Sequence, residues 1–381
     1  MDIYRLATEL NVPERKIIDF SSPVNPLGVS AKAKAEVRRY LKFLHRHPDT
    51  EALRLRKRLA QYHNLAPETI LCGNGSTDLL ALIAAVIAPR RVLIPVPTRG
   101  EYELICRKSG QTAVIHFPLA RENDFVLDVG GFIRRMAELS KGERSALSSA
   151  EGGVHNGDVM TGVDLSGDRN CLAFLCNPNY PTGRLLEKSA LDTIADAAMD
   201  LGCYLVVDEA FLDFVQGAPS LAGMVTRNPR LIVLRSMSYF FSLAGLRVGY
   251  GIFPVEICER LRGQRVPWTV NSLAQQAAAV VLKDKAYRKR TMTLVAEEKR
   301  FLERGFRRLG IDFCRSDAHF YLLRTERAAE ISRELMRRGM LVPECTGVPG
   351  LDGSYLCIAV KSHRENALLL KEMERVLSVR G

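Results

Sequence analysis

The strongest constraint on the fold is the alternation of short apolar runs with amphipathic helical patterns. The runs are rich in β-branched residues, end at turn residues, and fall at residues 91–96, 172–176, 203–208, 231–235 and 248–253. Strands that alternate with helices predict an α/β fold, in which helices cover both faces of a mostly parallel sheet. Functional side chains in such folds gather at the carboxyl ends of the strands.

The pattern changes after residue 255, where longer charged helices alternate with brief strands. The 381 residues also exceed what one hydrophobic core usually serves. We therefore expect an N-terminal arm (1–40) that packs with the smaller domain, a large α/β domain (41–255) and a smaller α+β domain (256–381). Residues 140–169 are rich in Gly, Ser and Asp and lack periodicity, which predicts a flexible surface insertion.

Composition narrows the class of protein: 47% hydrophobic and 25% charged residues are typical of a soluble globular chain. The net charge of +11 could suit nucleic acid or an acidic small molecule. The basic residues are dispersed over helical patterns without a nucleic-acid motif, so we expect solvated helix faces and no nucleic-acid partner. The longest apolar run, residues 79–88, is too short to cross a bilayer, and no secretory signal pattern is present. We expect a cytoplasmic protein with no membrane partner.

The nine cysteines never form a Cys-x-x-Cys pair and lie mostly in apolar stretches. This pattern predicts buried thiols rather than disulfides, and no metal site.

A glycine-rich turn, residues 73–77 (GNGST), follows a short apolar strand and opens an apolar helix. Gly75 lets the backbone approach a ligand, and the helix N-terminus beside Ser76 and Thr77 offers unpaired N–H groups, so the turn suits a phosphate. Helix capping by Ser76 or Thr77 explains the turn equally well. The turn is not a P-loop, because the Gly-Lys-Ser/Thr ending is absent.

Two further motifs follow buried strands. Asp208 closes an apolar strand, and a buried carboxylate there needs a cationic or hydrogen-bonding partner; the alternative is a helix cap. Ser236, Ser238 and Arg247 follow the next strand and could close a phosphate site with the glycine-rich turn. Without the other motifs, Arg247 would be interpreted as one partner of a surface ion pair.

Together, these motifs resemble the pyridoxal-phosphate (PLP) site of class I/II aminotransferases. The resemblance narrows to the threonine-phosphate decarboxylase and histidinol-phosphate aminotransferase branch on residues 19–28 (DFSSPVNPLG), 95–98 (PVPT), 101–103 (EYE), 208–214 (DEAFLDF), 266–271 (VPWTVN) and 349–352 (PGLD). It implies a fold-type I PLP-dependent transferase, with a mostly parallel seven-stranded sheet, a smaller α+β domain and a homodimer. Threonine-phosphate decarboxylases supply aminopropanol phosphate to the cobalamin nucleotide loop.

The resemblance also implies roles for individual residues. Asp208 would pair with the pyridinium nitrogen and keep the ring an electron sink. Asn25 would contact the substrate, a phosphorylated small molecule. The remaining cofactor contacts would come from Gly75, Ser76, Thr77, Tyr102, Ser236, Ser238 and Arg247.

The sequence departs from the family pattern at the positions that carry the chemistry. Tyr239 stands where the family has the Schiff-base lysine, and the nearest lysines in sequence are Lys188 and Lys283. A phenol cannot form an imine. Tyr180 replaces an asparagine that addresses the ring hydroxyl.

The sequence also departs from the family pattern at the positions that bind substrate. Cys357 and Pro343 stand where two arginines would bind the substrate carboxylate and phosphate, and neither a thiol nor a proline replaces a bidentate arginine. Lys361 remains nearby as a point charge. His47 stands where the partner subunit offers a tyrosine to the cofactor phosphate.

Three hypotheses follow. The first is a threonine-phosphate decarboxylase homologue with a degenerate site and altered or lost catalysis, including a regulatory binding protein. The second is an active decarboxylase or aminotransferase that holds PLP non-covalently. The third is a PLP-independent enzyme in which Tyr180 and Tyr239 do acid-base work; a tyrosine pKa of about 10 would then have to be lowered by a cation such as Arg247. The alternative to the third is that both rings fill space that the cofactor has vacated.

Overall fold

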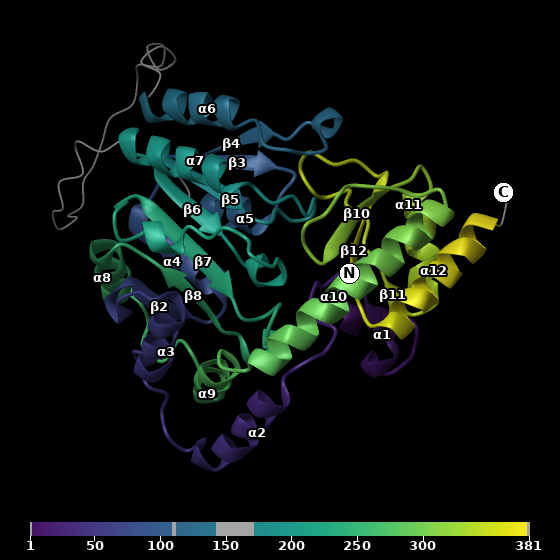
Figure 1. Ribbon diagram of the computed structural model, residues 1–381, viewed down its shortest axis with the longest axis horizontal. Coiled ribbons are helices and arrows are strands. Elements are labelled where there is room, and N and C mark those ends of the chain that lie inside the picture. The colour runs from purple at the N-terminus through teal and green to yellow at the C-terminus, as the bar shows by residue number, and fades with distance from the viewer. Residues whose placement is uncertain (1, 109–111, 142–170, 379–381) are drawn as a thin grey trace, which may run out of the picture.

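The computed structural model describes residues 2–108, 112–141 and 171–378. Its largest element is a seven-stranded sheet (Figure 1), with strands in the order β2 (Ile70–Gly73), β8 (Gly249–Ile252), β7 (Leu231–Ser236), β6 (Tyr204–Asp208), β5 (Cys171–Cys176), β3 (Arg91–Val96) and β4 (Ala113–Pro118). Only β8 breaks the parallel arrangement, pairing antiparallel with β2 and β7. The mostly parallel seven-stranded sheet is therefore confirmed. The insertion expected at residues 140–169 lies almost wholly outside the described residues.

Helices cover both faces of this sheet. Successive strand residues point to opposite faces, so Leu71 and Val206 pack into one core, whereas Cys72 and Leu205 pack into the other. The first face carries α4 (Ser76–Ile87), α5 (Glu101–Lys108) and α8 (Val255–Gln264). The second face carries α3 (Leu53–His63), α6 (Val129–Lys141), α7 (Lys188–Asp200) and α9 (Ser272–Val281), with α6 and α7 side by side in Figure 1.

A second, smaller sheet has its own core. Its antiparallel strands lie in the order β12 (Tyr355–Ala359), β10 (Phe320–Arg324) and β9 (Asp312–Phe313). Around its core lie α11 (Ala328–Arg337), α12 (His363–Ser378) and the second half of α10 (Lys285–Arg308). Figure 1 shows α10 running from α9 to this sheet; Tyr287 near its start packs in the large core, and Phe306 near its end packs in the small one.

The N-terminal segment contacts both parts. It begins with α1 (Ile3–Glu9), and β1 (Ile18–Asp19) then pairs in parallel with β11 (Met340–Leu341), which ties this stretch to the smaller part. By contrast, α2 (Ala31–Tyr40) packs against α9, which covers the large sheet. The expectation that all of residues 1–40 pack with the smaller domain therefore does not match the packing.

The boundary expected at residue 256 also differs from the packing. Helices α8 and α9 lie beyond it, yet Ile257 and Leu261 pack in the core beneath α4, and Ala277 packs in the core on the opposite face. The reason is that hydrophobic periodicity predicts which face of a helix is buried but not which sheet it covers.

The structure also bears on the expectations for membrane spans and for the cysteines. Within the described ranges, no helix combines the length and low polarity that a membrane crossing requires. The nine cysteines all lie in the described part of the chain, and no disulfide joins them; Cys314 is half-buried and the other eight are buried.

Candidate functional site

An aromatic pocket of about 260 Å³ lies beyond the carboxyl ends of β3, β5, β6 and β7. Tyr180 follows β5, Phe211 follows β6 and Tyr239 follows β7, so neighbouring parallel strands deliver all three rings to one edge of the sheet. Of the residues predicted from the sequence, Tyr180 and Tyr239 line this aromatic pocket. The full lining is Ser21, Ser22, Pro23, Thr98, Arg99, Gly100, Glu101, Tyr180, Phe211, Tyr239 and Val348.

Asp208 lies behind this pocket and is completely buried. Its Oδ2 accepts hydrogen bonds from Arg99 Nη1 at 3.0 Å and from Tyr102 OH at 2.8 Å. Its Oδ1 accepts from the Ala210 backbone N–H at 3.0 Å. The cationic partner that a buried carboxylate requires is therefore Arg99, a residue of the protein itself.

Arg99 lies between Asp208 and the pocket. Besides Asp208, it binds Glu101 with two parallel hydrogen bonds, from Nε at 3.0 Å and Nη2 at 2.9 Å. Its guanidinium carbon also lies 5.9 Å from the ring centroids of both Phe211 and Tyr239, within reach of a cation–π interaction. Only 6% of the side chain is exposed, so Arg99 is fixed by contacts on several sides.

The two tyrosines predicted from the sequence pack in an aromatic cluster. The Tyr239 ring lies 4.5 Å from that of Phe211, and the Tyr180 ring lies 5.8 Å from Phe211 and 5.1 Å from Phe320. Burial raises the pKa of Tyr239, although the positive charge of Arg99 opposes the shift. Burial, with Cys357 beside it, raises the pKa of Tyr180 well above its usual value. Neither phenol is poised to act as a base at neutral pH, and the cation beside Tyr239 is Arg99 rather than Arg247.

Tyr102, predicted as a cofactor contact, instead donates its hydroxyl hydrogen to Asp208. Its ring stacks on Phe174 at 4.8 Å and is fully buried. Burial, followed by the negative charge of Asp208, raises the pKa of Tyr102 well above its usual value, so the phenol remains a proton donor to the carboxylate.

The glycine-rich turn lies beside β8, apart from the aromatic pocket. Gly75 has φ +81°, and a Cβ built there would lie 2.4 Å from Arg247 Nη2, so the guanidinium lies over this glycine. A Cβ on Gly249 would lie 2.5 Å from the Ser76 backbone nitrogen. Close backbone packing thus brings Arg247, Gly75 and the start of α4 together.

The structure tests the capping explanation of this turn. Helix α4 begins at Ser76 with Gly75 as its N-cap, and no side chain makes the capping hydrogen bond. Ser76 is buried and Thr77 is half-buried within the first turn. Capping by Ser76 or Thr77 is therefore wrong, and backbone N–H groups of α4 are left for another acceptor.

Two serines, Ser236 at the end of β7 and Ser238 just after it, lie at the same edge of the large sheet as the glycine-rich turn. Ser236 pairs in register with Gly249, which lies against Ser76. Ser236 Oγ accepts a hydrogen bond from the Ser238 backbone N–H at 3.2 Å, and both serines are buried. The predicted phosphate-binding residues therefore approach one another, with Arg247 exposed above them. We call Gly75, Ser76, Ser236, Ser238 and Arg247 the anion site, after the role that the sequence predicts for them.

The residues predicted to bind substrate are engaged elsewhere. Asn25 donates from Nδ2 to Phe240 O at 2.8 Å and to Thr291 Oγ1 at 2.7 Å, so its amide serves the scaffold. Cys357 is buried in β12, against Tyr180. Lys361 Nζ donates to the Ser22 carbonyl at 2.8 Å, just behind the pocket wall, and burial lowers the pKa of this amine.

Two other positions lie away from the pocket lining. Pro343 follows β11 and is half-buried. His47 is exposed and stacks on Trp268, with ring centroids 4.9 Å apart. Its predicted role at a partner subunit's site remains a prediction.

Sequence reasoning missed Arg99, Glu101 and Phe211 as site residues. Arg99 comes three residues after the buried strand β3, and a charged residue in that position needs a partner for the same reason that Asp208 does. Applying that argument to both residues would have predicted that each needs a partner at the same edge of the sheet, because Arg99 follows one parallel strand and Asp208 ends another. It would not have predicted that they pair with each other.

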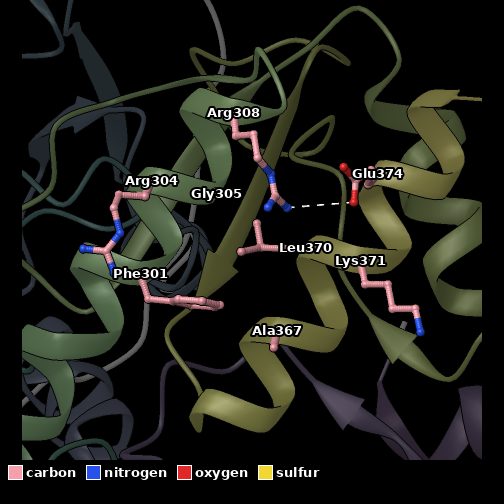
Figure 2. A pocket seen from close by; sticks show the side chains of 8 residues that line it. All are labelled: Phe301, Arg304, Gly305, Arg308, Ala367, Leu370, Lys371 and Glu374. Carbon is pink, nitrogen blue, oxygen red and sulfur yellow. Dashed lines mark ion pairs between the residues drawn. The ribbon is translucent and has the colours of Figure 1, made fainter.

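A second pocket lies on the smaller part of the molecule, between α10 and α12 (Figure 2). It measures about 300 Å³, and its charged lining comes from Arg304, Arg308, Lys371 and Glu374. Arg308 and Glu374 form an exposed ion pair of 3.8 Å. This open groove offers no buried polar group, so we place the candidate site at the sheet edge. Nowhere in the described residues do three or more His, Cys, Asp or Glu side chains gather as a metal would require.

Comparison with known proteins bears on the family and the fold of this chain. The family model for aminotransferase class I and II matches residues 15–369. The chain is 32% identical over 380 residues to threonine-phosphate decarboxylase of Salmonella typhimurium, covering 99% of this chain and 96% of that protein. It superposes on L-threonine-O-3-phosphate decarboxylase of Porphyromonas gingivalis with TM-score 0.78 and 25% identity, covering 95% of this chain and 99% of that one.

A third comparison supports the fold alone. Histidinol-phosphate aminotransferase of Sinorhizobium meliloti, solved in complex with pyridoxal-5'-phosphate, superposes with TM-score 0.82 at 18% identity, covering 99% of this chain and 94% of that one. This chain therefore belongs to the class I and II aminotransferase family, a family of PLP-dependent enzymes.

Proposed function

We propose that this chain is a homologue of threonine-phosphate decarboxylase that has lost Schiff-base decarboxylation and keeps a site for a phosphorylated small molecule. The observation that carries the proposal is the buried ion pair between Arg99 and Asp208. Tyr239, at the position of the family's lysine, packs beside this pair and cannot form an imine.

The phosphate end of PLP fits the residues present. The N-terminus of α4 lacks a side-chain cap, and Arg247 lies over Gly75, so this end offers backbone donors and a positive charge to an anion.

The residues present do not fit the ring end of PLP. Asp208 is the group that would bind the pyridinium nitrogen, yet it has no exposed surface and already accepts three hydrogen bonds. No lysine is among the residues that line the aromatic pocket. We therefore derive no catalytic step through PLP in this chain.

The substrate side supports the same proposal. Cys357 packs against Tyr180 in the protein interior and offers no charge to a carboxylate. The raised pKa values of Tyr180 and Tyr239 argue against the hypothesis that either acts as a base, and their aromatic packing supports the filling of vacated space. A homodimer of such chains, with a phosphorylated ligand at the anion site, is our proposal for the functional unit.

The test is carbon dioxide release from O-phospho-L-threonine in the presence of added PLP. The Salmonella typhimurium decarboxylase serves as the positive control, and PLP without protein gives the background rate. We expect no release above background, and no PLP adduct on any side chain after borohydride reduction and mass spectrometry. Turnover near that of the control, or a reduced adduct, would show that the proposal is wrong.

A further inference from the structure

We propose that Arg99 is a specificity-determining residue that excludes a pyridinium ring by serving as the permanent counter-ion of Asp208. This inference rests on the proposed function and deepens it. It assigns the loss of cofactor binding to a residue outside the Schiff-base position, so that Tyr239 is only one of two independent defects.

Access to the carboxylate is controlled by Arg99. Asp208 has 0% exposed surface and does not line the aromatic pocket, whereas Arg99 does. Any ring that enters the pocket therefore meets the guanidinium before the carboxylate. A ring nitrogen could bind Asp208 only if Arg99 first moved away.

Arg99 is also firmly held in this position. Three of its nitrogens make hydrogen bonds, one to Asp208 and two to Glu101, and two aromatic faces lie within 5.9 Å of its charge. Displacing it would break a bidentate pair and leave two carboxylates without their shared cation.

The charge of Arg99 opposes that of the ring. A protonated ring nitrogen and a guanidinium are both cations, so they compete for the single carboxylate rather than share it. In a buried setting, one carboxylate cannot stabilise two cations that also repel each other. The anion site lies apart from this pocket, so Arg99 would not exclude ligands that bind through a phosphate and need no anionic partner for a ring.

The consequence is that lysine at position 239 alone cannot restore the cofactor. Tyr239→Lys would supply the amine, but Arg99 would still cover Asp208 and would repel the new ammonium group. Removing the charge of Arg99 together with this change should free the carboxylate for the ring.

The experiment uses four full-length proteins: wild type, Tyr239→Lys, Tyr239→Lys/Arg99→Met, and Tyr239→Lys/Arg56→Met as the matched control. Arg56 is as buried as Arg99, at 6% exposure, and pairs with Glu51 at 3.0 Å away from the pocket. PLP is titrated against each protein by absorbance, and borohydride reduction followed by mass spectrometry detects a lysine adduct.

We expect Tyr239→Lys and the matched control to bind PLP no better than wild type. We expect Tyr239→Lys/Arg99→Met to bind at least tenfold more tightly and to give a reducible adduct on the introduced lysine. Tight binding by Tyr239→Lys alone, or no gain in a folded double variant, would overturn the inference. Neither outcome bears on carbon dioxide release by wild type, so the proposed function is judged separately.

A second measurement needs no variant, in case the loss of Arg99 prevents folding. PLP and inorganic phosphate are titrated against wild-type protein by calorimetry. If Arg99 excludes the ring, the two ligands bind with affinities within about threefold, or neither binds. PLP binding tenfold or more tighter than phosphate would overturn the inference.

Discussion

At the residue scale, the site is defined by which charge pairs with Asp208. The sequence indicates that this carboxylate needs a partner, and the resemblance assigns that role to the cofactor nitrogen. The structure supplies Arg99 instead, and no local pattern around residue 99 predicts the pairing, because the two residues lie 109 positions apart in the chain. The pair forms only because β3 and β6 lie in one parallel sheet with β5 between them.

The two halves of this ion pair should differ in their contribution to stability. Arg99→Met leaves Asp208 and Glu101 without their cation, and breaking a buried pair costs about 3–5 kcal/mol. Asp208→Asn leaves Arg99 paired with Glu101, so we expect a smaller loss of about 1–2 kcal/mol. Urea denaturation of both variants measures the difference, and an equal or larger loss for Asp208→Asn would contradict this assignment of charges.

His319 gives a prediction for pH dependence. It is fully buried and stacked on Phe214, and burial lowers its pKa to about 3. The unfolded chain binds this proton below about pH 6.5, whereas the folded chain does not, so stability falls as the pH drops below that value. The expected loss from His319 is about 2 kcal/mol between about pH 6.5 and about pH 5.

The measurement is urea denaturation across that pH range for wild type and His319→Gln. The control is His45→Gln, at an exposed position. The glutamine variant at position 319 should lose stability less steeply on acidification, while the control follows wild type. Parallel curves for all three proteins would rule out the buried neutral histidine as the cause. His63, whose pKa burial also lowers to about 3, adds a second contribution that all three share.

At the element scale, the anion site depends on how closely β8 packs against the start of α4. Periodicity and the glycine-rich turn predict this helix and its preceding strand from the sequence. The antiparallel pairing of β8 with β2, which brings Gly249 against Ser76, is not predicted, because pairing partners far apart in the chain leave no local pattern.

Gly249→Ala tests this packing. The added methyl would lie 2.5 Å from the Ser76 nitrogen and 2.8 Å from the Gly75 carbonyl carbon, so the backbone must move. We expect a loss of about 1–3 kcal/mol in unfolding free energy and weaker phosphate binding. Gly245→Ala, where a Cβ meets no atom within 4 Å, is the control and should leave phosphate binding unchanged. Equal behaviour of the two variants would contradict the proposed packing.

At the scale of the whole molecule, the class of fold follows from the sequence but the division into two parts does not. Residues 256–281 lie on the large sheet although their helical patterns resemble those of the smaller part, and α10 joins both cores.

The surface of the molecule carries a group of exposed apolar side chains. Leu44 is 57% exposed, Val266 74% and Trp268 49%. His47 stacks on Trp268, which brings the two segments together.

We expect this surface to be covered by a second copy of the chain. Val266→Ser/Trp268→Ser should convert a dimer to a monomer in sedimentation equilibrium, because the apolar area that favours association is removed. Val126→Ser, at an apolar residue of 42% exposure elsewhere, should leave the dimer intact. A wild-type monomer, or a double variant that stays dimeric, would contradict this expectation.

The central claim, that Arg99 rather than a cofactor ring is the partner of Asp208, is tested most directly by a crystal structure of the wild-type protein grown with saturating PLP. We predict the Arg99 guanidinium within hydrogen-bond distance of Asp208 Oδ2, Tyr239 beside it, and any bound phosphate confined to the anion site. A pyridine nitrogen on Asp208, with Arg99 displaced into solvent, would contradict the claim.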